Sequence, residues 1–544
     1  MPIRRLEPTA SATGFNLLIK SLLSAPLACA PDQEIVYRDR MRLTYRDWRT
    51  RLGRLASALT SLGVAPGDTV AVMDWDSHRY LECYFAVPMM GAVLQTVNIR
   101  LSPQQIAYTL AHAEASTILV HADFVPLLAG LLPGLPAVRR IVLLHDDAPS
   151  APPFAVAGAY ETLLAAADPG FDFPDFDEDA VATTFYTTGT TGEPKGVAFS
   201  HRQIVLHTLA AAVALASPAA GQRFHRGDVY MPLTPMFHVH AWGLPYVATM
   251  LGVKQVYAGR YEPATILGLR RREGVSFSHC VPTVLQMLLD AKDLAQERLD
   301  GWTMVIGGSA LTLGLTRAAT ARGIDVFGGY GMSETCPIMT LAQPGTATDD
   351  AALAARTRTG RPVPLIDLAI VDESGVELPR DGRATGEIAV RAPWVAGGYV
   401  KQPDASAQLW RGGRLHTGDI AAIGSDGVVQ ISDRAKDVIK TGGEWVSSIA
   451  VEDAIGRLDG VAEVAVIGIA DAKWGERPLA LVVRRDPRLD AEAVKAHIAA
   501  FAARGALSRY AVPEQVRFVE ALARTSVGKI DKKALRRQHA PEPA

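Results

Sequence analysis

The sequence predicts an α/β protein: a large N-terminal domain of parallel α/β sheets with a β-rich subdomain, followed by a small, mobile α+β C-terminal domain. Three observations support this prediction. Apolar, strand-like runs alternate with helical patterns through most of the chain, short strands and turns replace them near Ile366, and a separate unit begins past Asp433. A chain of 544 residues is also too long for one hydrophobic core, so two or more domains are expected.

The buried strands of the large domain are expected at compact apolar runs that end in glycine or polar residues. These runs are residues 70–75 (VAVMDW), 116–122 (STILVHA), 140–146 (RIVLLHD) and 303–309 (TMVIGGS). Between them, residues 45–63 and 103–115 have the pattern of amphipathic helices. This alternation favours largely buried parallel sheets.

The C-terminal part of the sequence predicts two smaller units. Residues 367–392 are typical of short strands joined by turns. The elements expected beyond them are strands at 461–470 and 477–485, a helix at 491–505 that ends at Gly505, and a final helix at 532–538. We therefore predict an N-terminal domain at 1–432, a hinge at 433–436 and a C-terminal domain at 437–544. The composition of DRAKDVIKTGG fits a hinge and fits a rigid surface turn equally well.

Composition and charge exclude several classes of protein. A formal net charge of −2 gives no general attraction to nucleic acid or to anionic membranes. The four cysteines are scattered without metal-binding spacing, which predicts a reducing, cytoplasmic environment without a disulfide framework. Polar residues interrupt the N-terminal apolar stretch, so we do not expect a secretion signal. Residues 204–221 are apolar but broken by Pro218, and we expect a buried helix there rather than a membrane span.

A loop rich in glycine and threonine, YTTGTTGEPKG, occupies residues 186–196. It has two interpretations: a surface linker, or a loop that binds phosphate oxygens through backbone N–H groups, hydroxyls and the charge of Lys195. The pattern differs from the P-loop motif because Pro194 precedes the lysine and Gly196 follows it. If the loop binds a nucleoside triphosphate, it does so in a different fold.

Two further segments strengthen the nucleotide interpretation. GGYGMSETCP, at 328–337, combines glycines that allow close backbone approach with an aromatic face, a hydroxyl and the carboxylate of Glu334, which suits Mg²⁺. LHTGDIA, at 415–421, places Asp419 where its carboxylate can accept hydrogen bonds from ribose hydroxyls. Taken alone, the first can be an ordinary strand-to-helix turn, and Asp419 can simply form a turn.

Together with DRAKDVIKTGG and TSVGKIDKK, these motifs resemble the adenylate-forming enzymes in order and spacing. That superfamily includes acyl-CoA synthetases, adenylation domains of peptide synthetases and beetle luciferases. The resemblance covers the chain from about Ile35 onward, and PMFHVHAWGLPY (235–246) with GGEWVSS (442–448) is most similar to fatty acyl-CoA synthetases, including medium-chain and methylthiopropionate-type ligases. It implies ATP, Mg²⁺ and CoA as the cofactors, and a carboxylic acid as the substrate.

The resemblance also implies roles for individual residues. The residues that would hold the β- and γ-phosphates are Thr187, Thr188, Gly189, Thr190, Thr191, Gly192 and Lys195. Those that would line the adenine and α-phosphate site are Gly308, Gly329, Tyr330, Gly331 and Ser333. Asp419 and Arg434 would hold the ribose, and Glu334 with Thr188 would bind Mg²⁺.

For the C-terminal domain, the resemblance implies a rotation about the hinge position, Lys436, where many relatives have Asp. Lys529 would assist adenylation, although from the residues alone it is a solvated lysine in a basic tail. After the rotation, the residues that would serve the nucleotide or the CoA side are Lys440, Gly442, Gly443 and Trp445.

The acid-binding site is expected around FHVHAWG. The residues that the resemblance assigns to the acid are His238, Trp242, Gly243, Gly307, Gly308 and Met332, with His238 near the reacting carboxylate and Trp242 as a gate. Alternation along a strand would place His238 and His240 on one face, but no third zinc ligand is evident. Cys280 can line this pocket or pack in the core, and the core is the better expectation for a cysteine.

The predicted function is an ATP-dependent ligase that joins a fatty, medium-chain acid to CoA through an acyl-adenylate. Alternatives are a methylthiopropionate or aromatic acid–CoA ligase, and an adenylating ligase that loads a carrier protein. The FHVHAWG stretch lacks the Asp that would meet an amino-acid ammonium. A non-catalytic nucleotide-binding protein is a third possibility, which the joint presence of Glu334, Asp419, Arg434 and Lys529 opposes. Relatives are often dimers, and we expect neither nucleic-acid binding nor stable membrane insertion.

Overall fold

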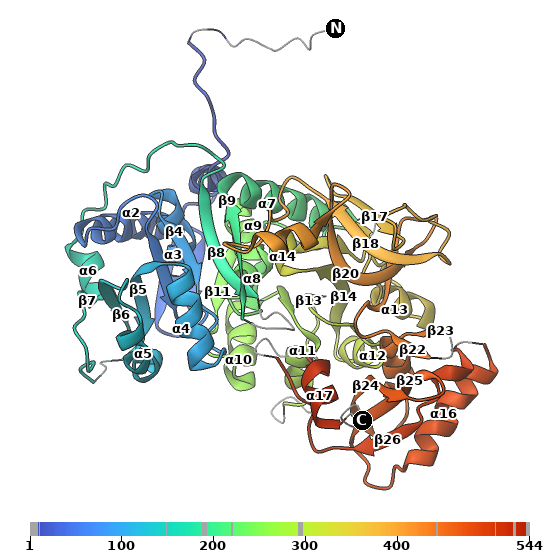
Figure 1. Ribbon diagram of the computed structural model, residues 1–544. Coiled ribbons are helices and arrows are strands. Elements are labelled where there is room, and N and C mark those ends of the chain that lie inside the picture. Colours follow the sequence, from blue (N-terminus) through green and yellow to red (C-terminus); the bar gives the residue numbers. More distant parts are fainter. Residues whose placement is uncertain are drawn as a thin grey trace.

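The computed structural model describes residues 9, 11–147, 150–187, 193–218, 221–291, 298–441, 444–505, 507–525 and 529–539. Within these ranges the chain forms two large, mostly parallel sheets, an antiparallel five-stranded sheet and a C-terminal unit with its own sheet (Figure 1). The predicted fold class is therefore confirmed. In Figure 1 the C-terminal unit is red and lies at the lower right, below the orange β-rich subdomain.

The first large sheet has seven strands, in the order β7-β6-β5-β3-β4-β8-β9, and contains three of the four predicted strands. Its neighbouring strands are parallel except for the hairpin of β8 and β9. The strands are β3 (Thr69–Met73), β4 (Val93–Thr96), β5 (Ala115–His121), β6 (Arg140–Leu144), β7 (Gly158–Ala159), β8 (Val181–Thr187) and β9 (Lys195–Ser200). Its central strands are buried and rich in Val, Ile and Leu, as expected of strands covered on both faces.

The second large sheet has nine strands, in the order β16-β15-β14-β13-β12-β10-β11-β1-β2. From β1 to β14 its interior pairs are parallel, and antiparallel pairs close both edges. The strands are β1 (Glu34–Tyr37), β2 (Met41–Thr44), β10 (Val229–Leu233), β11 (Lys254–Tyr257), β12 (Phe277–Cys280), β13 (Trp302–Ile306), β14 (Ile324–Gly331), β15 (Ile338–Leu341) and β16 (Arg361–Pro362). Cys280 is fully buried in the core of this sheet, as predicted.

Helices connect the parallel strands and cover the two sheets (Figure 1). They are α1 (Ser24–Cys29), α2 (Tyr45–Ser61), α3 (His78–Met89), α4 (Pro103–His112), α5 (Val125–Leu131), α6 (Tyr160–Ala166), α7 (His201–Ala216), α8 (Val239–Trp242), α9 (Leu244–Leu251), α10 (Pro263–Glu273), α11 (Pro282–Leu289), α12 (Leu313–Ala321) and α13 (Asp350–Arg356). The starts of α2, α4 and α7 are fixed by capping boxes, in which Thr44, Ser102 and Ser200 accept from the third helical N–H. The expected buried helix is α7, and no helix within the described ranges is long and apolar enough to cross a membrane.

Two smaller sheets follow. The β-rich subdomain contains β17 (Asp367–Val371), β18 (Thr385–Arg391), α14 (Pro403–Leu409), β19 (Trp410–Arg411), β20 (Arg414–Ile423) and β21 (Val429–Arg434). The C-terminal unit contains β22 (Ile439–Thr441), β23 (Glu444–Val446), α15 (Ser448–Gly456), β24 (Val461–Asp471), β25 (Gly475–Arg484), α16 (Ala491–Ala503), β26 (Gln515–Phe518) and α17 (Lys532–His539). The proposed hinge, 433–436, spans the last two residues of β21 and the start of the connection to β22, and its movement stays a prediction.

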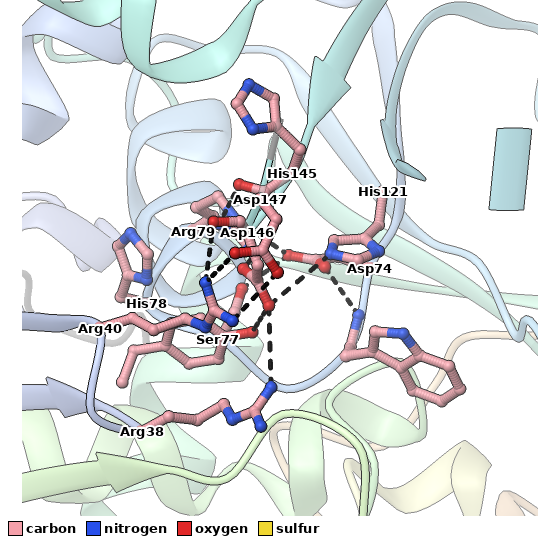
Figure 2. Close-up of polar contacts among 12 residues, drawn as sticks. Arg38, Arg40, Asp74, Ser77, His78, Arg79, His121, His145, Asp146 and Asp147 are labelled. Atoms are coloured by element: carbon pink, nitrogen blue, oxygen red, sulfur yellow. Dashed lines mark hydrogen bonds and ion pairs between the residues drawn. The ribbon is translucent and has the colours of Figure 1, made fainter. Parts of the chain in front are cut away.

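Buried charges join the two large sheets near the carboxyl ends of β3, β5 and β6. Figure 2 shows the Arg79 guanidinium between the carboxylates of Asp74 and Asp146, at N–O distances of 3.4 and 2.8 Å. The hydroxyl of Tyr37, at the end of β1 in the other sheet, donates to Asp146 at 2.6 Å. Burial opposes ionisation of Asp146, but the hydrogen bonds from Tyr37 and Arg79 outweigh it and hold the pKa of this carboxyl below its ordinary value. This network fixes the β1 edge of one sheet against the other.

We predict that Arg79→Met lowers the free energy of unfolding by about 3–5 kcal/mol, because it leaves the buried carboxylate of Asp74 without a counter-charge. The shift is measured as a lower urea midpoint and melting temperature. The matched control is Arg298→Met, which breaks an exposed ion pair with Asp300 and is expected to leave the urea midpoint and melting temperature nearly unchanged. Equal shifts in the two variants would contradict a stabilising role for the buried network.

Candidate active site

A cavity of about 790 Å³ lies where the large sheets, the β-rich subdomain and the C-terminal unit meet. The structure brings most of the predicted site residues together around it. The predicted residues that line it are Thr187, Lys195, His238, Trp242, Gly307, Gly308, Gly329, Tyr330, Gly331, Met332, Ser333, Glu334, Arg434, Lys436 and Lys529. Segments more than 300 residues apart in the chain therefore contribute to one site.

The topology of the second large sheet explains this convergence. Strand β10 lies between β11 and β12, so the connections that follow it leave in opposite directions. Ligands bind in α/β sheets at such a switch point, outside the carboxyl ends of the strands. The segment after β10 carries His238, the segment after β13 carries Gly307 and Gly308, and the end of β14 supplies Gly329 and Tyr330.

Asp419 is held in place by two neighbouring side chains. The β20–β21 register places it opposite Arg434, whose Nε lies 3.1 Å from Asp419 Oδ1. The hydroxyl of Tyr330 donates to Asp419 Oδ2 at 2.6 Å. Asp419 does not itself line the cavity, but both partners do. Tyr330 thus orients an acidic side chain, in addition to offering the aromatic face that the sequence predicted.

Glu334 is a buried carboxylate at the cavity wall, in the short 3₁₀ turn Ser333–Thr335. Burial raises its pKa above the ordinary value, although the hydrogen bond from Tyr399, at 2.6 Å, acts in the opposite direction. The ammonium of Lys195 lies 4.5 Å from the centre of the Tyr399 ring. A buried carboxylate with so little compensating charge is an oxygen donor suited to a bound Mg²⁺.

Sequence reasoning missed Tyr399, which connects Glu334 with Lys195. It belongs to the segment GGYVK, which carries no recognisable motif. An isolated bridge between Tyr399 and Val197 brings it beside β9, so only the tertiary structure identifies this residue. Asn98 also lines the cavity without a signal in the sequence, whereas Thr417 and Asp433 line it from within the motifs LHTGDIA and DRAKDVIKTGG.

Lys529 reaches the cavity from the C-terminal unit. Gly308 has a φ of +79° and faces the lysine side chain, so a Cβ at this position would lie only 3.1 Å from Lys529 Cε. Burial, together with the nearby charge of Arg434, lowers the pKa of Lys529 to about 8. Lys529 is therefore not the solvated residue that its basic neighbours suggest.

Two basic residues of the tail after Lys529 form ion pairs. Lys532 contacts Glu452 at 2.7 Å, and Arg536 contacts Asp437 at 2.7 Å, one residue after the proposed hinge position. Both basic residues line the cavity. Lys436 also lines it, and its pKa is lowered by burial and by Arg434.

The segment around His238 does not form the strand that the sequence predicts. Val239, His240, Ala241 and Trp242 have φ angles of 47°, 54°, 47° and 60°, so α8 is a left-handed turn built without glycine. This conformation costs roughly 1–2 kcal/mol per residue. His238 and Trp242 line the cavity, whereas His240 is fully buried against Tyr84 and Phe185. The two histidines therefore do not share a face, because the turn separates them.

The end of the cavity beside Trp242 is apolar. Its walls are formed by Val239, Trp242, Val305, Ile338 and Leu341. Gly307 faces the Trp242 ring, and a Cβ there would lie 3.1 Å from its Cη2 atom. Gly243 lies outside the lining, where a Cβ would approach the His207 ring to 2.8 Å. This arrangement can bind an aliphatic or thioether chain, and none of the five wall residues named offers a charged partner to an ammonium.

Other predicted residues are not placed in this cavity. Lys440, in β22, does not line it, and its backbone pairs with that of Trp445 in β23. The predicted residues that lie outside the described ranges are Thr188, Gly189, Thr190, Thr191, Gly192, Gly442 and Gly443. Among the described residues, the cavity therefore unites the predicted nucleotide, acid and Lys529 positions, but not the CoA-side hairpin.

Two family profiles match the chain. The family described as AMP-binding enzyme matches residues 24–400, and the family described as AMP-binding enzyme C-terminal domain matches residues 450–529. A long-chain-fatty-acid–CoA ligase of Thermus thermophilus is 40% identical over 506 residues, which cover 92% of this chain and 90% of the relative.

Two further comparisons agree with these matches. A 3-methylmercaptopropionyl-CoA ligase of Ruegeria pomeroyi is 39% identical over 496 residues, or 89% of each chain. Among solved structures, ATP-bound MatB from Rhodopseudomonas palustris is similar at a TM-score of 0.83 and 27% identity, covering 96% of this chain and 99% of that one. Both the sheets that form the cavity and the C-terminal unit are thus shared with these proteins.

Proposed function

Because this chain belongs to the AMP-binding enzyme family, we propose that it is a fatty acid–CoA ligase that forms acyl-CoA, AMP and pyrophosphate from an acid, ATP and CoA. The observation that carries the proposal is the meeting of Glu334, the Asp419–Arg434 pair and Lys529 around one cavity with an apolar end. Polar groups at one end suit a nucleotide, and aliphatic walls at the other suit the tail of an acid.

In the first half-reaction, a carboxylate oxygen of the acid attacks the α-phosphorus of ATP. An oxygen–phosphorus bond forms to give the acyl-adenylate, and the bond to pyrophosphate breaks. Both reactants are anionic, so the cationic side chains of Lys195 and Lys529 would offset their repulsion. Asp419, fixed by Tyr330 and Arg434, would accept hydrogen bonds from the ribose. Mg²⁺ held by Glu334 would neutralise charge on the departing phosphates.

In the second half-reaction, the CoA thiol attacks the acyl carbonyl. A carbon–sulfur bond forms, the bond to the AMP oxygen breaks, and the thiol proton is released. We propose that the C-terminal unit turns about Lys436 between the two steps, so that Lys529 withdraws and the β22–β23 hairpin approaches. The presence of Lys529 in the cavity wall, and the absence of Lys440 from it, support an arrangement suited to the first step.

The acid is proposed to be a fatty acid of medium length. The apolar walls support an uncharged tail, and the two relatives reported above are named for a long-chain acid and for a short methylthio acid. We also propose that the enzyme works in the cytoplasm, since all four cysteines are free and three of them are buried. Assembly as a homodimer remains part of the proposal.

The experiment that tests the function measures pyrophosphate release, AMP and acyl-CoA over a panel of acids, with and without CoA. The panel contains straight-chain acids of short, medium and long length, 3-methylmercaptopropionate and aromatic acids. The expected result is AMP and acyl-CoA in equal amounts, with the highest kcat/KM at medium length. Adenylation without transfer to CoA would favour a carrier protein as the acceptor. Failure of every acid to yield AMP would overturn the proposal.

We predict that Lys529→Ala slows acyl-adenylate formation on the order of 10²–10³-fold, because a charge-stabilising donor is lost. The conversion of supplied acyl-adenylate to acyl-CoA should remain within about threefold of wild type, since the lysine has no proposed role in that step. Single-turnover assays measure the two half-reactions separately. Equal losses in both would refute the assignment of Lys529 to adenylation.

The lowered pKa of Lys529 predicts a pH dependence. The ammonium form is present below about pH 8 and is lost as the pH rises through that value. Because kcat/KM for ATP reports the free enzyme, it should be constant at lower pH and fall about tenfold per unit at higher pH. In Lys529→Arg the guanidinium stays charged, so the alkaline decline should disappear even if the rate is lower. An unchanged decline in this variant would assign the titration to another group.

A further inference from the structure

The left-handed turn that presents His238 and Trp242 to the cavity is held by side chains of the other large sheet. The turn lacks glycine, so its backbone conformation is unfavourable unless surrounding groups restrain it. The peptide that enters it, Met236–His238, follows β10. The N–H of His238 donates to the Pro235 carbonyl oxygen within the segment at 2.9 Å, whereas main-chain groups of Met236 and Phe237 bind side chains from elsewhere in the chain.

Three buried side chains bind this peptide. Asp76 Oδ1 accepts from the backbone N–H of Met236 at 2.9 Å, and the Tyr84 hydroxyl donates to the carbonyl oxygen of the same residue. The Thr96 hydroxyl donates to the carbonyl oxygen of Phe237 at 3.0 Å. Asp76 follows β3, Tyr84 lies in α3, and Thr96 ends β4, so all three lie in the β3–α3–β4 unit of the seven-stranded sheet.

Asp76 is itself fixed on both sides. Its backbone oxygen accepts from Gly259 at 2.9 Å, and its second carboxylate oxygen accepts from the Tyr261 hydroxyl at 2.5 Å. Asp76 is 4% exposed, and burial raises its pKa to about 7 despite these hydrogen bonds and the charge of Arg100. The carboxylate therefore has little freedom to follow the peptide if the peptide moves.

Tyr84 also supports the turn itself. The Tyr84 ring packs edge-on against His240, at 5.7 Å between centroids, and stacks on Tyr246 in the helix that follows. Among the described residues, neither ring nitrogen of His240 has a hydrogen-bond partner. The turn is thus held by packing at His240 and by hydrogen bonds at Met236 and Phe237.

We propose that Asp76, Tyr84 and Thr96 are positioning residues for the acid subsite, which hold the His238–Trp242 turn in the conformation that lines the cavity. The inference rests on the proposed function for the identity of the bound acid. None of the three lines the cavity, so they act only through the peptide that they bind. The groups proposed to bind the nucleotide, such as Asp419 and Glu334, lie on other elements. Relaxing the turn should therefore weaken binding of the acid and leave binding of ATP largely unchanged.

The test uses the full-length enzyme with Tyr84→Phe and Thr96→Val, each of which removes one hydroxyl without a large change of volume. We expect KM for the acid to rise about three- to tenfold, with KM for ATP within about twofold of wild type. Hydrogen exchange of the segment 236–243 in the ligand-free enzyme should become faster, with other segments unchanged. The matched control is Tyr45→Phe, which removes a buried hydroxyl that donates to the Val253 carbonyl oxygen at 2.7 Å and not to residues 236–243.

A second pair of variants tests the hydrogen bond from Met236. Asp76→Asn retains an oxygen that can accept from this N–H and should preserve KM for the acid, whereas Asp76→Ala should raise it. The proposal is overturned if KM for acid and ATP rise together, if Tyr45→Phe has the same effect, or if exchange at 236–243 is unchanged. If wild-type enzyme activates no acid, the proposed function fails, and the exchange experiment still decides whether these residues hold the turn.

Discussion

The site depends on the contact between the two large sheets along the carboxyl ends of their strands. Carboxylates that follow strands of one sheet bind groups of the other: the partly buried Asp146 accepts from Tyr37 at the end of β1, and the buried Asp76 accepts from Met236 after β10. Because an unpaired buried charge is costly, these contacts define the relative position of the sheets more narrowly than apolar packing would. Segments of both sheets line the cavity, so the positions of its walls depend on these contacts.

The C-terminal unit completes the cavity in a different way. It contributes Lys529, which is desolvated by the wall around Gly308 and lies near the charge of Arg434. The connection to the large domain passes through Arg434, which is also the partner of Asp419. The residues that hold the ribose in our proposal are therefore adjacent to the hinge, so a nucleotide bound there would contact both the site and the segment about which the C-terminal unit is proposed to turn.

Several parts of the fold and site could be predicted from the sequence because they depend on local pattern. The apolar runs at Val70, Ser116, Arg140 and Thr303 became buried parallel strands, and glycine-containing motifs marked the places where backbone approaches the cavity. The environment of Lys529 could not be predicted locally, because its basic neighbours indicate a solvated tail. Tyr399 lies in no motif, and the left-handed turn after His238 contradicts the conformation that its residue types favour.

By itself, the sequence determined the α/β class, the order of the motifs and the types of group available for the chemistry, since these follow from periodicity and residue identity. The tertiary structure alone decided which groups meet: the pairing of Tyr330 and Arg434 with Asp419, the burial that shifts the pKa of Lys529, and the restraint of Met236 by Asp76. These depend on contacts between distant segments, and on how much water each contact excludes, neither of which a local pattern encodes.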